Sequence, residues 1–151
     1  MTTTSSTGAH HEYPWPALFT AFSGVFMAIM DVFVVLVAAP AIQADLHASD
    51  ASVQLVLAGY QIAYAITLVA GGRLGDRYGR RRLFMIGLAV FTSASAACGL
   101  APGESALIGA RLVQGVGAAL LFPQAFSLTQ ALVPADRRDR VLGVLGVVIG
   151  S

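Results

Sequence analysis

Long apolar stretches alternate with short polar connections along this chain. A membrane-spanning helix needs about 20 mostly apolar residues to cross roughly 30 Å of hydrocarbon. Four stretches reach that length, and they cover residues 17–39, 52–71, 83–101 and 105–126. A fifth apolar run covers residues 141–151 and, with about ten residues, is too short to span as it stands. The pattern predicts an all-α membrane protein with four complete transmembrane helices and the truncated start of a fifth.

The first 16 residues are mostly polar and contain no long apolar stretch. Residues 1–16 are rich in Thr and Ser and are interrupted by Pro14 and Pro16, which indicates a flexible tail. The organisation expected is therefore a tail over residues 1–16 and a partial transmembrane bundle over residues 17–151. A cleavable signal peptide is a poor alternative for the first stretch, because no basic residue precedes it, it is too long, and it contains Asp31.

Composition agrees with a chain surrounded by lipid. Hydrophobic residues make up 56% of it and charged residues 11%, with a mean hydropathy of +0.74, whereas a soluble domain carries about 25% charged residues. The net charge of +1 does not indicate a nucleic-acid partner. The single cysteine, Cys98, forms no internal disulfide and belongs to no metal-ligand pattern, so no metal site is expected. We expect Cys98 to be a packing residue in a lipid-facing, apolar setting.

The arginines are distributed unevenly among the connections. The chain has no lysine, and eight of its nine arginines lie after the second or the fourth apolar stretch. The ionisable residues of the other two connections are three acidic residues and one histidine: Asp45, His47, Asp50 and Glu104. Because basic loops stay on the cytoplasmic side, the sequence predicts that both arginine-rich connections and the N-terminus are cytoplasmic.

Two ionisable residues, Asp31 and Arg111, lie inside the apolar stretches. Each costs about 2.5–3.5 kcal/mol at the centre of a membrane helix, so a functional reason is the first hypothesis. Asp31 lies roughly 12 Å below the outer end of its stretch, and Arg111 lies roughly 9 Å below the outer end of the fourth. Opposite charges at one depth suit a shared, protein-lined cavity, and a purely structural ion pair is the alternative.

Polar side chains also follow one face of the second stretch. Their spacing of i, i+4 and i+7 matches a helix, and an adjoining pair of amides widens the stripe. Such a stripe suits a cavity wall or hydrogen bonds between helices, and the spacing does not choose between these. The candidate cavity-lining residues are Gln54, Tyr60, Gln61, Tyr64, Thr67 and, on the fourth stretch, Gln114.

The glycine–arginine segment, residues 72–82, connects the second and third stretches. Its glycines permit a tight turn and close helix contact. Asp76 is placed to pair with a neighbouring arginine or to cap a helix N-terminus. Charges and helix dipoles of this kind form a latch that can break and re-form as two bundles rock. The residues of this expected cytoplasmic gate are Gly72, Gly75, Asp76, Arg77, Gly79, Arg80, Arg81 and Arg82.

Three motifs resemble those of the major facilitator superfamily of secondary transporters. The glycine–arginine segment matches GxLxDRxGRRR, and the run from Arg111 to Gly117 resembles RxxQGxG. The run from Asp31 to Pro40 resembles the DxTVVNVALP motif of the fourteen-helix drug/proton antiporters, with Phe33, Leu36 and Ala39 at three of its positions. The resemblance implies an incomplete N-terminal helix bundle of the major facilitator fold.

The same resemblance implies a function. It predicts the N-terminal part of a proton-coupled multidrug or small-molecule efflux transporter in the cell membrane, not active alone. Asp31 is expected to exchange a proton or meet a cationic group of the substrate, and Arg111 to take part in proton coupling. The helix-packing residues implied are Gly115, Gly117, Gly143, Gly146 and Gly150, the last three opening a glycine-rich antiporter motif.

The resemblance also sets expectations for partners. It implies no cofactor, since a proton gradient supplies the energy. The expected partners are the lipid bilayer, protons, a small amphipathic or cationic substrate, and the missing C-terminal helices or another chain, with no nucleic acid. Two alternatives stay open: a truncated membrane protein that only associates with other helices, and a transporter of another substrate class. An enzyme is not expected, because the sequence has no GxSxG, no HExxH and no paired aspartates within the spans.

Overall fold

The computed structural model of the protein describes residues 15–132 and Gly143. Over residues 15–132 the chain forms four helices joined by short connections: α1 (Trp15–Asp45), α2 (Asp50–Tyr78), α3 (Arg80–Gly99) and α4 (Glu104–Leu132). No strand occurs in this part of the chain. The prediction of an all-α bundle with four long helices is therefore confirmed.

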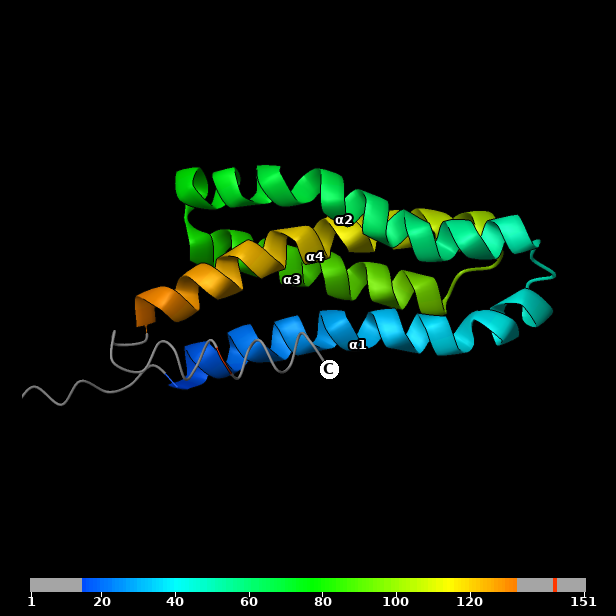
Figure 1. The fold of residues 1–151 in the computed structure, drawn as a ribbon, viewed down its shortest axis with the longest axis horizontal. Coiled ribbons are helices and arrows are strands. Elements are labelled where there is room, and N and C mark those ends of the chain that lie inside the picture. Colours follow the sequence, from blue (N-terminus) through cyan, green and yellow to red (C-terminus); the bar gives the residue numbers. More distant parts are fainter. Residues whose placement is uncertain (1–14, 133–142, 144–151) are drawn as a thin grey trace, which may run out of the picture.

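The four helices lie alongside one another, and successive helices run in opposite directions (Figure 1). The start of α1, the α2–α3 connection and the end of α4 lie at one end of the bundle, and the other two connections lie at the opposite end. Helix α4 packs most extensively against α2 and α3 and much less against α1. The fourth helix is thus the centre of the bundle.

The core is small and lies along α4. Its members are mostly alanines and aromatic residues, which allow the helices to approach closely: Ala21, Val25, Ala28, Tyr60, Phe84, Phe91, Ala118, Leu121 and Ala125. Many large apolar side chains instead face outward, among them Phe19, Val37 and Ile66. All four helices are long and apolar enough to cross a membrane. An apolar outer surface of this kind suits lipid as the surrounding solvent.

The helices begin and end where their local chemistry allows. At the start of α2, the Ser49 hydroxyl accepts a hydrogen bond from the backbone N–H of Ser52 at 3.1 Å, and Asp50 adds a negative charge in the first turn. Glu104 adds such a charge at the start of α4. Helices α1 and α4 each contain a proline, Pro40 and Pro123, and each proline removes one intrahelical donor.

The connection between α2 and α3 is shorter than the sequence indicates. Helix α2 continues through Gly72 and Gly75 to Tyr78, and α3 begins two residues later at Arg80. Only Gly79 leaves helical geometry, with φ of 93°, a value that suits glycine because it has no Cβ. The expected loop over residues 72–82 is therefore two helix ends joined by one residue, since its other residues are compatible with a helix.

Some of the sequence predictions concern residues outside the described part of the chain. These are residues 1–14 of the tail expected over residues 1–16, the arginines of the fourth connection, and Gly146 and Gly150. The last two residues of that expected tail, Trp15 and Pro16, begin α1. Of the fifth apolar run only Gly143 is described; it is helical and exposed. No described atom lies within 4 Å of the position that a Cβ on Gly143 would occupy.

Candidate functional site

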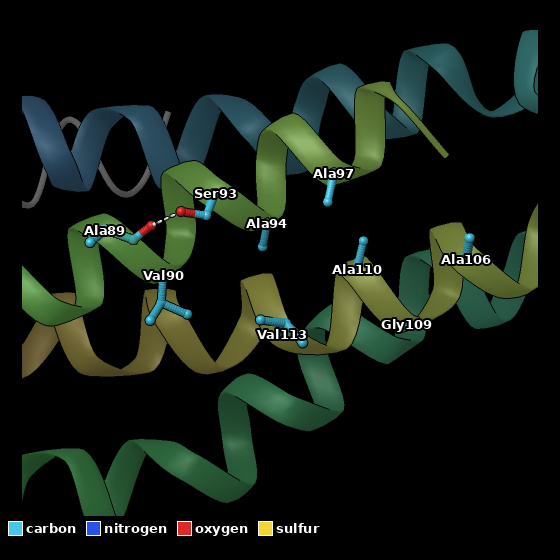
Figure 2. A pocket seen from close by; sticks show the side chains of 9 residues that line it. All are labelled: Ala89, Val90, Ser93, Ala94, Ala97, Ala106, Gly109, Ala110 and Val113. Carbon is cyan, nitrogen blue, oxygen red and sulfur yellow. Dashed lines mark hydrogen bonds between the residues drawn. The ribbon is translucent and has the colours of Figure 1, made fainter. Parts of the chain in front are cut away.

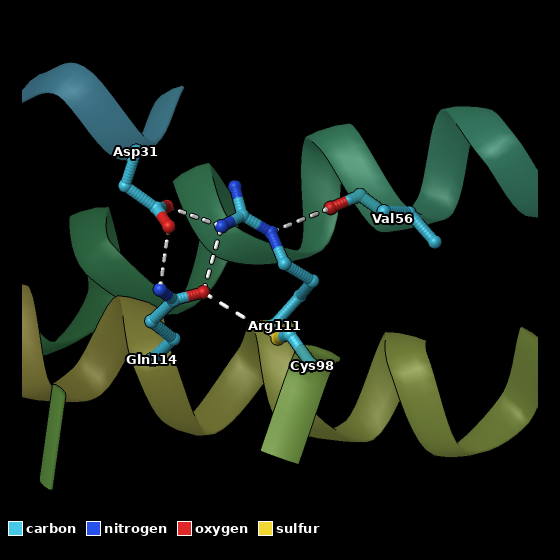
Figure 3. A network of polar contacts seen from close by, with 5 residues as sticks. All are labelled: Asp31, Val56, Cys98, Arg111 and Gln114. Atoms are coloured by element: carbon cyan, nitrogen blue, oxygen red, sulfur yellow. Dashed lines mark hydrogen bonds and ion pairs between the residues drawn. The ribbon is translucent and has the colours of Figure 1, made fainter. Parts of the chain in front are cut away.

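An ion pair between α1 and α4 forms the centre of the candidate site. The Arg111 guanidinium donates from Nη1 to Oδ2 of Asp31 at 2.5 Å. Gln114 closes a ring around this pair: its Nε2 donates to Oδ1 of Asp31 at 2.7 Å, and its Oε1 accepts from Arg111 Nη1 at 2.7 Å (Figure 3). The two charges that the sequence places at one depth are therefore in direct contact.

Arg111 is held on several sides by polar groups. Its side chain is 2% exposed, and its Nε donates to the backbone carbonyl of Val56 at 3.4 Å. Its guanidinium carbon lies 4.5 Å from the centroid of the Tyr60 ring, within cation–π range. In the described part of the chain no buried side-chain nitrogen or oxygen lacks a hydrogen-bond partner. A buried guanidinium is tolerated here because carboxylate, amide, carbonyl and ring replace its hydration shell.

The local sequence explains how these groups meet. Arg111 and Gln114 are three residues apart on α4 and so share one face of the helix. One residue further, Gly115 lies against α2, and a Cβ at this position would overlap the backbone oxygen of Tyr60. The missing side chain lets α2 approach α4 closely enough for Val56 and Tyr60 to reach Arg111. The close approach of the two helices at Gly115 therefore helps to build the site.

An aromatic pocket adjoins the ion pair and shares Tyr60 with it. The rings of Tyr60 and Tyr64 are stacked with centroids 6.4 Å apart, and Phe122 meets Tyr64 edge-on at 5.6 Å. The pocket has a volume of about 250 Å³ and is lined by Ala28, Ile29, Val32, Phe33, Tyr60, Tyr64 and Phe122. Its α1 wall includes Phe33, which stands where the resembled antiporter motif has threonine.

Only part of the polar stripe on α2 lines the ion pair and the aromatic pocket. Tyr60 is buried and Tyr64 half-buried, but Gln54 and Gln61 are exposed, and Thr67 is half-buried without lining the pocket. Helix α2 faces α4 through Val56, Gly59, Tyr60, Gly71 and Gly75. The two glutamines lie beside that face, so the structure places them away from the ion pair.

Cys98 faces the neighbouring helix α4, and not the lipid that the sequence predicts for it. Its thiol donates to Oε1 of Gln114 at 3.6 Å, and the side chain is half-buried. The expected lipid-facing setting is wrong. Cys98 falls on the same face of α3 as the buried Phe91 and Ala94, and this spacing of three and four residues is the signal that points it toward α4.

A second hollow lies between α3 and α4 and has a different character. It measures about 590 Å³ and is lined by Ala89, Val90, Ser93, Ala94, Ala97, Ala106, Gly109, Ala110 and Val113 (Figure 2). None of these residues is ionisable, and the Ser93 hydroxyl donates to the carbonyl of Ala89 on its own helix at 2.7 Å. This groove therefore offers no group that can exchange a proton or pair with a charged ligand.

The glycine–arginine segment lies at the α2–α3 end of the bundle. Asp76 accepts a hydrogen bond from Arg80 across the turn at 3.0 Å, one of the two arrangements expected for it. Both side chains are exposed, and an exposed pair contributes about 0.2–1 kcal/mol. Arg77, Arg81 and Arg82 are exposed as well. The segment is thus a charged surface at one end of the bundle.

Comparison with known proteins identifies the family. The family model described as Major Facilitator Superfamily matches residues 21–151. The chain belongs to the Major Facilitator Superfamily. With its four apolar helices, this makes it a multi-pass membrane protein in a lipid bilayer, from a family of transporters of small substrates.

Curated members of the superfamily resemble this chain over most of its length. It is 47% identical over 151 residues to an uncharacterized MFS-type transporter of Mycobacterium tuberculosis, covering 98% of this chain and 26% of the relative. It is 41% identical over 138 residues to the tetracenomycin C resistance and export protein of Streptomyces glaucescens, covering 91% and 26% respectively. A multidrug resistance protein of M. tuberculosis is 38% identical over 80% of this chain and 23% of the relative. The chain thus spans about a quarter of the length of these relatives.

Proposed function

We propose that this chain is the N-terminal part of a proton-coupled exporter of small amphipathic molecules in the cell membrane. The observation that carries the proposal is the buried Asp31–Arg111–Gln114 network beside an aromatic pocket. The names of several relatives support export, including a probable actinorhodin transporter and a puromycin resistance protein. The N-terminus and the glycine–arginine segment face the cytoplasm in this proposal, because basic connections stay on that side.

The ion pair supplies a way to couple a proton to movement. A guanidinium and a proton compete for the same carboxylate oxygens, so separating Asp31 from Arg111 leaves the carboxylate open to a proton. Asp31 stands on α1, the helix that contacts α4 least among the three helices around it. Motion of α1 relative to α4 would therefore change the distance between Asp31 and Arg111 and, with it, the occupancy of the proton. This device requires no cofactor, because a proton gradient supplies the energy.

The pocket indicates what the exporter carries. Its wall is formed by aromatic and aliphatic side chains, which suit a flat apolar surface on the substrate. Asp31 is already paired with Arg111, so a cationic group on the substrate has to compete with the guanidinium for the carboxylate. Substrate and proton would then act on the same carboxyl group, which is the property that antiport requires.

The test uses the full-length protein of which this chain would be a part. Asp31→Asn and Arg111→Ala are each expected to abolish export driven by an imposed pH gradient, measured with a fluorescent aromatic substrate in inverted membrane vesicles. Asp45→Asn is the matched control, because Asp45 is an exposed aspartate at the end of the same helix. Unchanged proton-driven export in both variants would contradict the proposal.

Removing one partner of a buried ion pair costs about 3–5 kcal/mol of stability, so the amount of folded protein must be followed as well. The double variant Asp31→Asn/Arg111→Gln removes both charges and keeps hydrogen-bonding groups in place. It is expected to reach the membrane at a higher level than either single variant and to remain inactive. Recovery of proton-driven export in the double variant would show that the pair is structural only.

A further inference from the structure

A second buried polar contact joins α2 and α4, closer to the α2–α3 end of the bundle. Gln124 is 1% exposed, and its Nε2 donates to the backbone carbonyl of Gly71 at 2.9 Å. The other half of the same amide reaches Gly75, where a Cβ would overlap the side-chain oxygen of Gln124. One side chain of α4 therefore contacts α2 at two positions one helical turn apart.

The backbones of the two helices meet at the same place. Pro123 has no N–H, so the carbonyl of Ala119 lacks its usual donor four residues later. A Cβ on Gly71 would lie 2.7 Å from that carbonyl oxygen. The proline on α4 and the glycine on α2 together give a close backbone contact, and Gln124 lies directly beside it.

We propose that Gln124 is a positioning residue that fixes the end of α2, and with it the glycine–arginine segment, against α4. The segment begins at Gly72, directly after the Gly71 carbonyl that Gln124 holds. Arg111 and Gln114 belong to the same helix as Gln124, with Gln114 about 15 Å away along its axis. Helix α4 thus supplies Arg111 and Gln114 to the charged network and, further along its axis, holds the end of α2 through Gln124. The contribution of this contact to gating rests on the proposed function, but the positioning itself does not.

The two glycines of the segment that lie inside α2, Gly72 and Gly75, have different surroundings. An added methyl group at Gly75 would displace the Gln124 amide, which is buried and hydrogen-bonded to the Gly71 carbonyl. Gly72 has no described atom within 4 Å of the position its Cβ would occupy. An alanine in a helix is more favourable than a glycine where space allows it. Gly72→Ala is therefore a control for Gly75→Ala, because both change a glycine of α2 to alanine and only the second meets another side chain.

The first test is a suppression experiment on the purified full-length protein in detergent, read as the temperature of unfolding. Gly75→Ala is expected to lower this temperature clearly, and Gly72→Ala is expected to leave it equal or higher. Gln124→Ala in addition to Gly75→Ala is expected to recover much of the loss, because it empties the space that the added methyl group needs. Gln124→Met keeps the volume and loses the hydrogen bond, so it should not rescue Gly75→Ala.

The second test separates positioning from general stability and does not depend on transport. Hydrogen–deuterium exchange in Gln124→Met is expected to rise in peptides covering residues 70–78 and to stay at the wild-type rate in α3. A uniform rise over all helices would show that Gln124 acts only on overall stability and would overturn the inference. So would tolerance of Gly75→Ala, or losses that simply add in the Gly75→Ala/Gln124→Ala variant.

Discussion

At the residue scale, the protein's central feature is an arginine that is almost wholly removed from solvent. Hydrogen bonds to charged groups contribute about 1.5–3 kcal/mol each, and Arg111 makes such bonds to Asp31, Gln114 and Val56. Gln114 is the residue that satisfies both charges at once, with its oxygen toward the guanidinium and its nitrogen toward the carboxylate. The orientation of this amide therefore matches the ionised pair.

Gln114→Leu removes both of these bonds and leaves the ion pair without its bridge. We expect a loss of about 2–4 kcal/mol in the free energy of unfolding, measured by equilibrium unfolding in mixed detergent micelles. Gln61→Leu is the control, because Gln61 is an exposed glutamine on α2 that lies away from the network, and it should change stability by less than about 0.5 kcal/mol. Equal effects of the two substitutions would contradict the network as described.

Much of this site follows from the sequence, and the reason is geometric. The rise of a helix per residue places Asp31 and Arg111 at one depth, and an unpaired charge in a membrane is costly enough to make a pairing expected. The contacts of Arg111 with the Val56 carbonyl and of Cys98 with Gln114 do not follow. They depend on how closely neighbouring helices approach and at what rotation, which hydropathy does not specify.

At the element scale, glycines decide how closely the helices pack. Gly115 and Gly117 let α4 approach α2 and α3 respectively: a Cβ on Gly115 would overlap the backbone of Tyr60, and one on Gly117 would lie 2.6 Å from the backbone nitrogen of Phe91. Backbone atoms cannot move aside as side chains do. These two positions therefore hold the three helices in contact around the network.

Helix α4 contains one glycine in close contact with a neighbouring helix, Gly115, and one in open space, Gly109. Gly115→Ala is expected to destabilise the protein by about 1–3 kcal/mol, because the inserted methyl separates α2 from α4. Gly109→Ala, on the same helix, meets open space and is expected to stabilise it by about 0.5–1 kcal/mol through helix propensity. The same unfolding experiment measures both, and a Gly115→Ala variant as stable as Gly109→Ala would show that the close approach is not needed.

The elements themselves are largely predictable, whereas their ends are not. Twenty-residue apolar stretches specify four helices because lipid satisfies no backbone group, so each span must satisfy its own. The charged residues between the second and third stretches suggest a loop, yet the chain leaves helical geometry only at Gly79. Arginine is a good helix former, so polarity alone does not end a helix.

At the scale of the whole molecule, the distribution of polar groups is reversed relative to a soluble protein. Large apolar side chains cover the outside, while Arg111, Gln114 and Gln124 are the buried polar residues among those described. In the orientation proposed above, the arginine-rich α2–α3 end of the bundle faces the cytoplasm. A cysteine introduced at Tyr78, with Cys98 replaced by alanine, is expected to resist a membrane-impermeant maleimide added outside intact cells and to react in inverted vesicles. Labelling from outside would contradict the proposed orientation.

Proton release on substrate binding is a direct test of the role of Asp31 as the coupling carboxylate. Purified full-length protein in weakly buffered detergent would be mixed with substrate, and the change in proton concentration followed with a pH indicator. We predict that the wild type and Asp45→Asn release protons when substrate binds the population in which Asp31 is separated from Arg111 and protonated. We predict that Asp31→Asn binds substrate without releasing protons. The same proton release from Asp31→Asn as from the wild type would show that Asp31 is not the coupling carboxylate.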